Sequence, residues 1–189
     1  MKVVIMRHGK PDVPRFEKLK ACELYTWIES YNAAGILQKQ RPPVRTIEMV
    51  ARCKAVVCSD FPRSTQSAAA LNVKVLYSES LFREISLPYA KWNSLRFSPY
   101  VWAVFFRILW SFGYSSNGES FRSFQLRART GAQKLKQIAR EHGSVLFVGH
   151  GLINHFIAKE LLSSGWQGPT SPGRKYWAFG VYTYNARRA

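Results

Sequence analysis

Acidic residues are scarce in this sequence. Only 11 Asp and Glu stand against 28 Lys and Arg, so the formal net charge is +17. A charge of this size indicates the kind of binding partner rather than the fold. Anionic substrates, nucleic acids and acidic membranes are all compatible with it as partners. The basic residues are scattered along the chain, and no recognised nucleic-acid-binding module accompanies them. We therefore expect an anionic substrate, and no nucleic acid, as the partner.

Cysteine is scarce as well, and the three cysteine residues favour neither a disulfide nor a metal site. Cys22, Cys53 and Cys58 are odd in number, and their spacing fits no metal-binding motif. Free thiols of this kind are typical of a reducing compartment. The apolar part of the opening segment "MKVVIMRHG" is too short for the hydrophobic core of a signal peptide, and no cleavage pattern follows it. The expected location is cytoplasmic.

The sequence also lacks an apolar run long enough to cross a bilayer, which takes about 20 residues. Its most apolar segment, "SPYVWAVFFRILWSFGY" (98–114), carries Arg107 as its only charge. Three interpretations of this segment stay open: a helix that forms a lid over a site, a contact in a homodimer, and a surface that dips into an anionic membrane interface.

The 189 residues, 47% of them hydrophobic, are enough for one domain spanning 1–189, with 98–114 as an apolar helical insertion. Short continuous apolar runs predict buried strands, and apolar residues at helical spacing predict helices. The expected strands are 2–6, 55–59, 73–77, 144–149 and one or two within 175–185; the expected helices are 18–32, 44–52, 61–72, 118–141 and 150–162. This alternation favours an α/β fold, a three-layer α/β/α sandwich with a mostly parallel central sheet.

Polar side chains follow three of the expected strands directly. They are, in chain order, Arg7-His8-Gly9 after the first strand, Ser59-Asp60 and Arg63 after the second, and His150-Gly151 after the fourth. In open parallel sheets, ligands bind beyond the carboxyl ends of the strands. The pattern therefore predicts two histidines and two arginines at one edge of the sheet.

This combination suits a phosphoryl group. Arginine guanidinium groups match phosphate oxygens in bidentate pairs, and a neutral imidazole can attack phosphorus. Further donors, including the N-termini of helices, stabilise the charge on the equatorial oxygens. Two arginines oppose a metal cation, so no metal is expected, and His155 is expected to be a core or edge residue. Asp60 is expected to cap the helix that contains Arg63.

The same residues occur within an ordered series of motifs. "RHG" (7–9) is followed by "CSDFPRSTQSA" (58–68), "LFREISLP" (81–88), "NGES" (117–120) and "VGHG" (148–151). In this order the motifs resemble the phosphatase branch of the histidine phosphatase superfamily, which has the phosphoglycerate mutase-like fold. The resemblance covers roughly residues 1–160, that is, most of the chain.

The resemblance implies a role for each matching position. His8 would be the nucleophile that becomes phosphohistidine, and Glu84 would protonate the leaving oxygen and later activate water. Glu79 and Glu119 are alternatives to Glu84, and Glu119 could instead cap the 118–141 helix or orient an active-site group. No metal and no organic cofactor are implied. Arg7, Arg63 and His150 would join the catalytic groups by holding the phosphoryl group. The full substrate-binding set expected is Arg7, Gly9, Lys10, Arg63, Glu119, His150 and Gly151.

The sequence departs from the mutase pattern after "RHG". Mutases usually carry a small hydroxyl residue and then an asparagine there, whereas this chain reads Lys10-Pro11-Asp12. The chain is also shorter than typical mutases. We therefore expect a phosphomonoester hydrolase of the histidine acid phosphatase type acting on a phosphorylated substrate. The alternatives are a phosphoglycerate-type mutase and a non-catalytic module that binds a phospho-ligand or a membrane surface.

Overall fold

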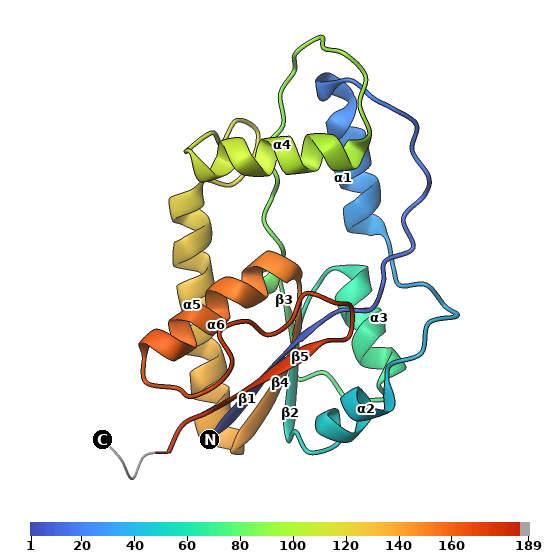
Figure 1. The fold of residues 1–189 in the computed structure, drawn as a ribbon. Helices are drawn as coiled ribbons and strands as arrows, with labels where there is room; N and C mark the ends of the chain where they lie inside the picture. The colour runs from blue at the N-terminus through green and yellow to red at the C-terminus, as the bar shows by residue number, and fades with distance from the viewer. Residues whose placement is uncertain (186–189) are drawn as a thin grey trace.

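A computed structural model describes residues 1–185, which form a five-stranded sheet flanked by helices (Figure 1). The strand order is β3-β2-β4-β1-β5. β1 pairs with β4, β4 with β2, and β2 with β3 in parallel, whereas β5 runs antiparallel to β1. The strands are β1 (Lys2–Arg7), β2 (Ala55–Ser59), β3 (Tyr77–Glu79), β4 (Ser144–Gly149) and β5 (Phe179–Thr183). The expected mostly parallel sheet is confirmed.

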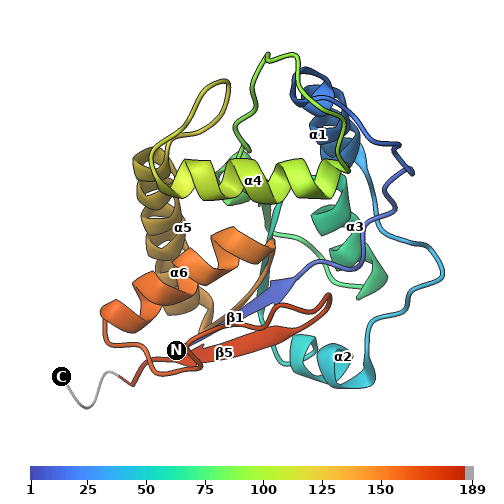
Figure 2. The same cartoon turned by 45° about the horizontal axis from the view of Figure 1, so that its top comes forward.

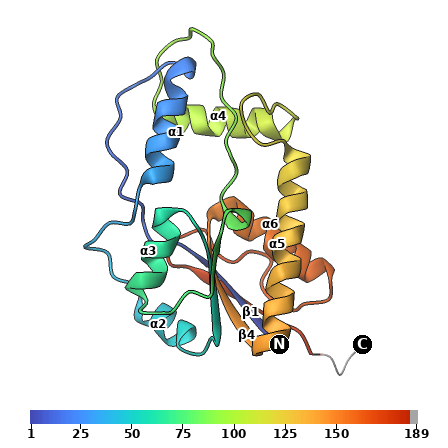
Figure 3. The same cartoon turned by 180° about the vertical axis from the view of Figure 1, so that it is seen from behind.

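Helices cover both faces of the sheet, as the alternation of strands and helices predicts (Figures 1 and 3). Successive strand residues point to opposite faces. In β1, Val3 and Ile5 pack in one buried cluster with α5 and α6, whereas Val4 and Met6 pack in another that includes residues of α2. The helices are α2 (Val44–Val50), α3 (Pro62–Ala70), α5 (Phe121–His142) and α6 (Gly151–Ser163). This is the expected three-layer α/β/α architecture.

The third strand differs from the prediction for 73–77. Pairing with β2 begins only at Tyr77, opposite Val57. Asn72 adopts a left-handed conformation (φ 53°) after α3, and Val73 and Val75 then pack against the core without joining the ladder. The apolar residues that suggested a strand therefore fill the crossing from the helix to the sheet.

The helix expected from residue 18 also begins later. Leu19 exchanges two backbone hydrogen bonds with Phe97 (2.8 and 3.0 Å), so it belongs to a bridge between two distant segments. A 3₁₀ turn, η1 (Ala21–Glu23), follows, and α1 spans Leu24–Ala33. Long-range backbone pairing thus replaces the first helical turn.

The remaining helix, α4 (Pro99–Ser111), lies across the end of the molecule toward which the parallel strands point (Figure 2). We call residues 19–33 and 85–118, which include α1 and α4, the cap. A third buried cluster joins the two helices through Leu24, Trp27, Trp102 and Phe106. The indole N–H of Trp102 donates to the Leu19 carbonyl (2.8 Å). In residues 1–185 no helix is both long and apolar enough to cross a membrane.

Candidate active site

The site forms where β1 and β4 end side by side. Arg7 is the register partner of Gly149, and the backbone N–H of His8 donates to the Gly149 carbonyl (3.0 Å). The following residues are His8 and His150, whose ring centroids lie 5.0 Å apart. The two histidines therefore meet because two parallel strands end at the same level, which is what the sequence pattern predicts.

The described part of the chain has a cavity of about 780 Å³ at this edge. Its floor carries six of the residues expected in the site: Arg7, His8, Arg63, Glu84, His150 and Gly151. Its roof comes from the cap, through Trp27, Ile28 and Tyr31 of α1 and Tyr100, Ala103, Val104 and Arg107 of α4. The cavity is thus polar at the sheet and largely apolar at the cap.

The His8 ring is held as one neutral tautomer. Its Nδ1 lies 2.6 Å from the Gly9 carbonyl, which can only accept, so Nδ1 carries the proton and Nε2 keeps a free lone pair. Burial lowers the pKa of His8 to about 3, against the raising effect of the Gly9 hydrogen bond and with smaller lowering effects from Arg63 and Arg7. At neutral pH, His8 is an uncharged imidazole with Nε2 available for attack.

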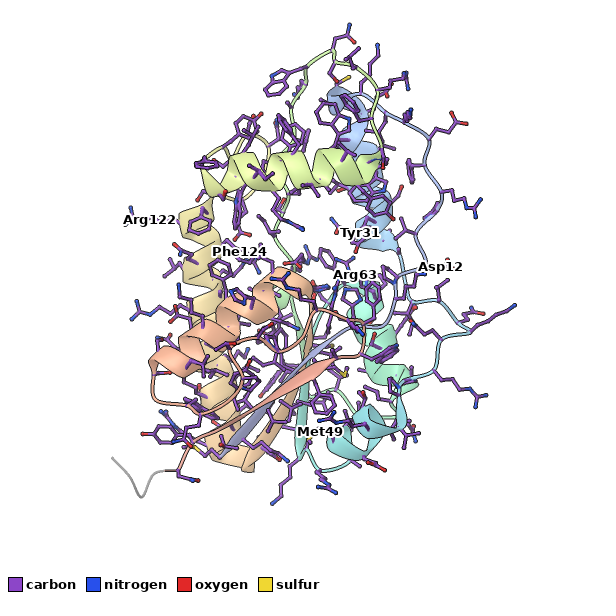
Figure 4. All side chains as sticks on the ribbon, viewed as in Figure 1. Asp12, Tyr31, Met49, Arg63, Arg122 and Phe124 are labelled. Carbon is purple, nitrogen blue, oxygen red and sulfur yellow. The ribbon has the colours of Figure 1, made fainter. Side chains whose placement is uncertain are left out.

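Arg63 reaches the site from the first turn of α3 and is only 1% exposed. Its Nε donates to His150 Nδ1 (3.2 Å), and its Nη1 donates to the Tyr31 carbonyl (3.0 Å). The guanidinium also lies 4.5 Å from the Phe61 ring centre and 4.9 Å from that of Tyr31. Figure 4 shows Tyr31 and Arg63 facing each other beneath α4. Aromatic faces stabilise a buried cation such as this guanidinium.

His150 is therefore also held in one orientation. Because Nδ1 accepts from Arg63, the proton lies on Nε2, which is 3.3 Å from the Ser64 hydroxyl. Burial first, and then the charge of Arg63, lowers the pKa of His150 well below its usual value. A neutral His150 can donate a hydrogen bond to an anion from Nε2 if that bond replaces the one to Ser64.

Arg7 lines the cavity and has an unused donor. Its Nη1 donates to the Arg174 carbonyl, and the guanidinium lies 4.5 Å from the Tyr176 ring centre. Its Nε is buried and has no hydrogen-bond partner among the described residues. Leaving a buried charged donor unpaired is costly, so this atom points to an anionic ligand as its partner.

Glu84 is fixed at the N-terminus of α6. Its Oε2 accepts from the Leu152 N–H (2.9 Å), and its Oε1 accepts from Ile153 (3.1 Å) and Ile85 (3.2 Å). These backbone N–H groups at the start of the helix hold the carboxyl group in one orientation. Glu84 thus contributes a positioned carboxylate to the same cavity as His8.

Three residues expected to bind substrate do not line the cavity. The N–H of Gly9 donates to the Ser67 hydroxyl (2.8 Å), and a Cβ at Gly9 would lie 2.4 Å from the Trp177 ring, so this glycine permits close packing behind the site. Lys10 lies on an exposed surface beside Gln40, which accepts from its backbone N–H. Glu119 pairs with Arg127 instead (2.7 and 2.9 Å).

Two smaller predictions are wrong. Asp60 does not cap α3, whose N-cap residue is Phe61; it forms two 2.7 Å hydrogen bonds with Arg83 instead, because a guanidinium lies within reach. Glu119 does not cap α5 either, since the side chain of Ser120 accepts from the Ser123 N–H. His155 is exposed at the rim of the cavity, so of the core and edge positions expected for it the structure shows the edge.

Sequence reasoning missed three polar residues that hold the site together. Ser64 contacts His150; Ser67 accepts from Gly9 and donates to the Arg63 carbonyl (2.6 Å); the Asn154 amide donates to the Met6 carbonyl (3.0 Å). Ser67 was detectable, because it lies one helical turn after Arg63 and hence on the same side of α3. Asn154 was detectable as a polar residue on the buried side of an apolar helix.

The donor set of the cavity does not suit a metal ion. In residues 1–185 no group of three or more His, Cys, Asp or Glu side chains is arranged to hold one. The charges around His8 come from arginines, which repel cations and attract phosphate. The floor can therefore bind a phosphoryl group, offer it an imidazole nitrogen and place a carboxylate nearby.

Comparisons with known proteins agree with this geometry. Residues 3–186 match the Histidine phosphatase superfamily (branch 1). No curated protein matches the sequence. Three of the similar solved structures are a mycobacterial glucosyl-3-phosphoglycerate phosphatase (TM-score 0.61, 19% identity, 95% of this chain and 88% of that one), Bacillus stearothermophilus YhfR (0.64, 17%, 98% and 92%) and mycobacterial hydrolase 1 (0.64, 19%, 100% and 92%).

At these identities the solved structures support the fold, whereas the family match extends over nearly the whole chain. The ordered motifs from "RHG" to "VGHG" lie inside the matched region. This chain belongs to the histidine phosphatase superfamily.

Proposed function

We propose that the protein is a metal-independent phosphomonoester hydrolase that works through a phosphohistidine on His8. The observation that carries the proposal is the neutral His8 ring, with its Nδ1 proton directed at Gly9 and its Nε2 free in a cavity lined by Arg7 and Arg63. A buried neutral imidazole is a competent nucleophile, and the two guanidinium groups attract the anion that it attacks.

The proposed reaction has two steps. In the first, His8 Nε2 forms a bond to phosphorus, the bond from phosphorus to the substrate oxygen breaks, and Glu84 delivers a proton to that oxygen. In the second, water attacks phosphorus, Glu84 takes its proton, and the phosphorus–nitrogen bond breaks to release inorganic phosphate. Arg7, Arg63 and His150 stabilise the charge on the phosphoryl oxygens in both steps.

The cavity roof favours a substrate with an apolar or aromatic alcohol part. Trp27, Tyr31 and Tyr100 line the roof above the charged floor. A bare sugar phosphate would leave this apolar surface in contact with polar groups, whereas an apolar alcohol would remove both surfaces from water. The apolar wall also favours a phosphatase that hydrolyses a bulky ester over a mutase that transfers phosphate between two hydroxyls of a small acid.

The first test is release of inorganic phosphate from an aryl phosphate and a panel of alkyl and sugar phosphates, in chelator. His8→Ala is compared with His142→Ala, because His142 is exposed at the end of α5, away from the cavity. Turnover should persist in chelator and in His142→Ala and fall at least about a thousandfold in His8→Ala. Turnover that survives His8→Ala would overturn the mechanism.

The role of Glu84 has its own test. Loss of a general acid slows departure of a poor leaving group more than of a good one, within the usual contribution of about 10²- to 10⁴-fold. Glu84→Gln should therefore slow alkyl phosphates more than nitrophenyl phosphate, and should let the phosphoenzyme accumulate with the latter. Equal losses on both substrates, without accumulation, would assign proton transfer to another group.

A further inference from the structure

The outward side of α4 is an apolar surface with no partner. Most of the exposed large apolar side chains of the described residues lie between 92 and 112, within the cap. Four of them recur at helical spacing on one side of the helix, and we call them the outer face of α4. The outer face consists of Val101 (51% exposed), Phe105 (39%), Ile108 (53%) and Phe112 (85%).

This surface is not needed for the packing of the cap. The opposite side of α4 buries Trp102, Phe106 and Trp110. A third side, with Tyr100 and Arg107, lines the cavity. The outer face therefore contributes neither to the packing of the cap nor to the lining of the cavity. Contiguous apolar surface of this kind marks a site of contact with a protein or a membrane.

The segment that carries the outer face has charge of one sign, whereas the other segment of the cap contains Glu23 and Glu29. No Asp or Glu occurs between Glu84 and Glu119, whereas Lys91, Arg96 and Arg107 lie in that interval. Arg96 pairs with Glu23 of the neighbouring segment (3.1 Å), and the other two lysine and arginine side chains are exposed. Arg122, near the junction of α4 and α5, adds a further cation (Figure 4). Apolar and aromatic side chains flanked by cations are typical of helices that lie in an anionic membrane interface.

A second copy of the chain fits this surface less well. Each copy carries a net charge of +17, so two caps brought face to face would repel each other, whereas anionic lipid headgroups would attract the same cations. α4 and α2 lie toward opposite ends of the molecule, with the start of α1 and the loop before α4 extending beyond α4 (Figures 1 and 3).

We propose that the protein docks on an anionic lipid surface through the outer face of α4. Its apolar side chains enter the headgroup boundary, and the neighbouring cations contact the lipid phosphates. Because Tyr100 and Val104 of the same helix line the cavity, docking brings the cavity close to the lipid. An amphiphilic phosphomonoester held in that surface would then be the substrate nearest to the site. The docking itself is independent of turnover.

The experiment measures co-sedimentation with vesicles of phosphatidylcholine alone and with vesicles containing about one-third phosphatidylglycerol. Wild type is compared with Ile108→Ser/Phe112→Ser. The matched control is Val44→Ser/Ile47→Ser, since these two residues are 71% and 45% exposed on α2 at the far end of the molecule. Circular dichroism and thermal unfolding without lipid verify that all three proteins are folded.

Wild type and the α2 control should bind the anionic vesicles and dissociate from them as the salt concentration is raised. Neither protein should bind vesicles of phosphatidylcholine alone. The α4 variant should bind at least about tenfold more weakly. Absence of wild-type binding to anionic vesicles, or equal binding by the α4 variant, would overturn the proposal. So would a lipid-free dimer that the α4 variant converts to a monomer, because the face would then join two copies. None of these readouts requires catalysis, so they do not depend on His8.

Discussion

The edge of the sheet and the cap above it face the same cavity but are stabilised in different ways. At the sheet edge, directed contacts orient each of the polar side chains: His8 to Gly9, Arg63 to His150, Glu84 to the start of α6. In the cap, aromatic and aliphatic side chains form the buried cluster between the two helices, and one side of α4 stays exposed. The comparison suggests that the sheet edge sets which group reacts, whereas the cap sets what is attached to it.

The two regions should also differ in rigidity. The strands of the sheet are covered by helices on both faces, whereas the buried cluster of the cap joins only two helices and their flanking segments. Regions with fewer buried contacts open at lower free energy than the core. We therefore expect the cap to open more readily than the sheet edge.

Among the variants that test this comparison, the largest effect is expected from removing the buried cation of the sheet edge. Arg63→Met keeps apolar volume but removes the charge and the bond to His150. We expect kcat/KM to fall by about 10²- to 10³-fold, because charge stabilisation at the phosphoryl oxygens is lost. Steady-state kinetics measure this, with Arg45→Met, an exposed arginine on α2, as the control. Equal losses of kcat/KM in both variants would mean that Arg63 does not stabilise the phosphoryl group.

The next effect tests the rigidity of the cap. Phe106 in the cap and Phe147 in the sheet are both fully buried. Each Phe→Ala change should cost about 3–5 kcal/mol where the cavity cannot collapse. We expect Phe106→Ala to raise amide hydrogen exchange mainly in 19–33 and 99–111, and Phe147→Ala to raise it throughout the molecule. A uniform rise in Phe106→Ala would mean that cap and sheet unfold as one unit.

The third effect follows from the buried neutral histidines of the sheet edge. The pKa of His8 is lowered to about 3, so below pH 6.5 the unfolded chain binds a proton that the folded chain does not bind. The free energy of unfolding therefore falls as pH decreases from 6.5 toward 3, by up to about 1.4 kcal/mol per pH unit for such a histidine.

Urea unfolding at several pH values, without phosphate, measures this slope. His8→Asn should flatten it, whereas His142→Asn, at an exposed site, should leave it steep. An unchanged slope in His8→Asn would mean that other groups dominate the acid response. Phosphate is omitted because an anion in the cavity would favour the charged histidine and hide the difference.

The smallest effect concerns the link between the two regions. Glu119 pairs with Arg127, and Arg127 donates to the Leu81 and Arg83 carbonyls, directly before Glu84. Glu119→Gln should loosen this segment and lower kcat by about tenfold with little change in KM, as expected for positioning. The loss should also be larger for alkyl than for nitrophenyl phosphate. A change in KM alone would indicate contact with substrate instead.

The sequence was most informative where local pattern and chain order agree. Apolar runs located three of the five strands within a residue or two, and the strand ends then placed Arg7, His8 and His150 together. It was least informative where distant segments compete: Asp60 bonds to Arg83 rather than to its own helix, and Leu19 pairs with Phe97 rather than starting a helix. Such contacts depend on which segments become neighbours in the fold, which spacing along the chain does not encode.

The strand that ends at His8 has a consequence for synthesis. β1 is the first strand of the chain, yet both of its neighbours, β4 and β5, come from the last 46 residues of the sequence. Contacts so distant in sequence form late, because the intervening chain must first exist and then close. On the ribosome, β1 emerges before β4 and β5, and both of its edges stay unpaired until residues 144–183 follow. The cavity at the end of β1 therefore assembles only after residues 144–183 have been translated, and nascent fragments that end before them remain without it.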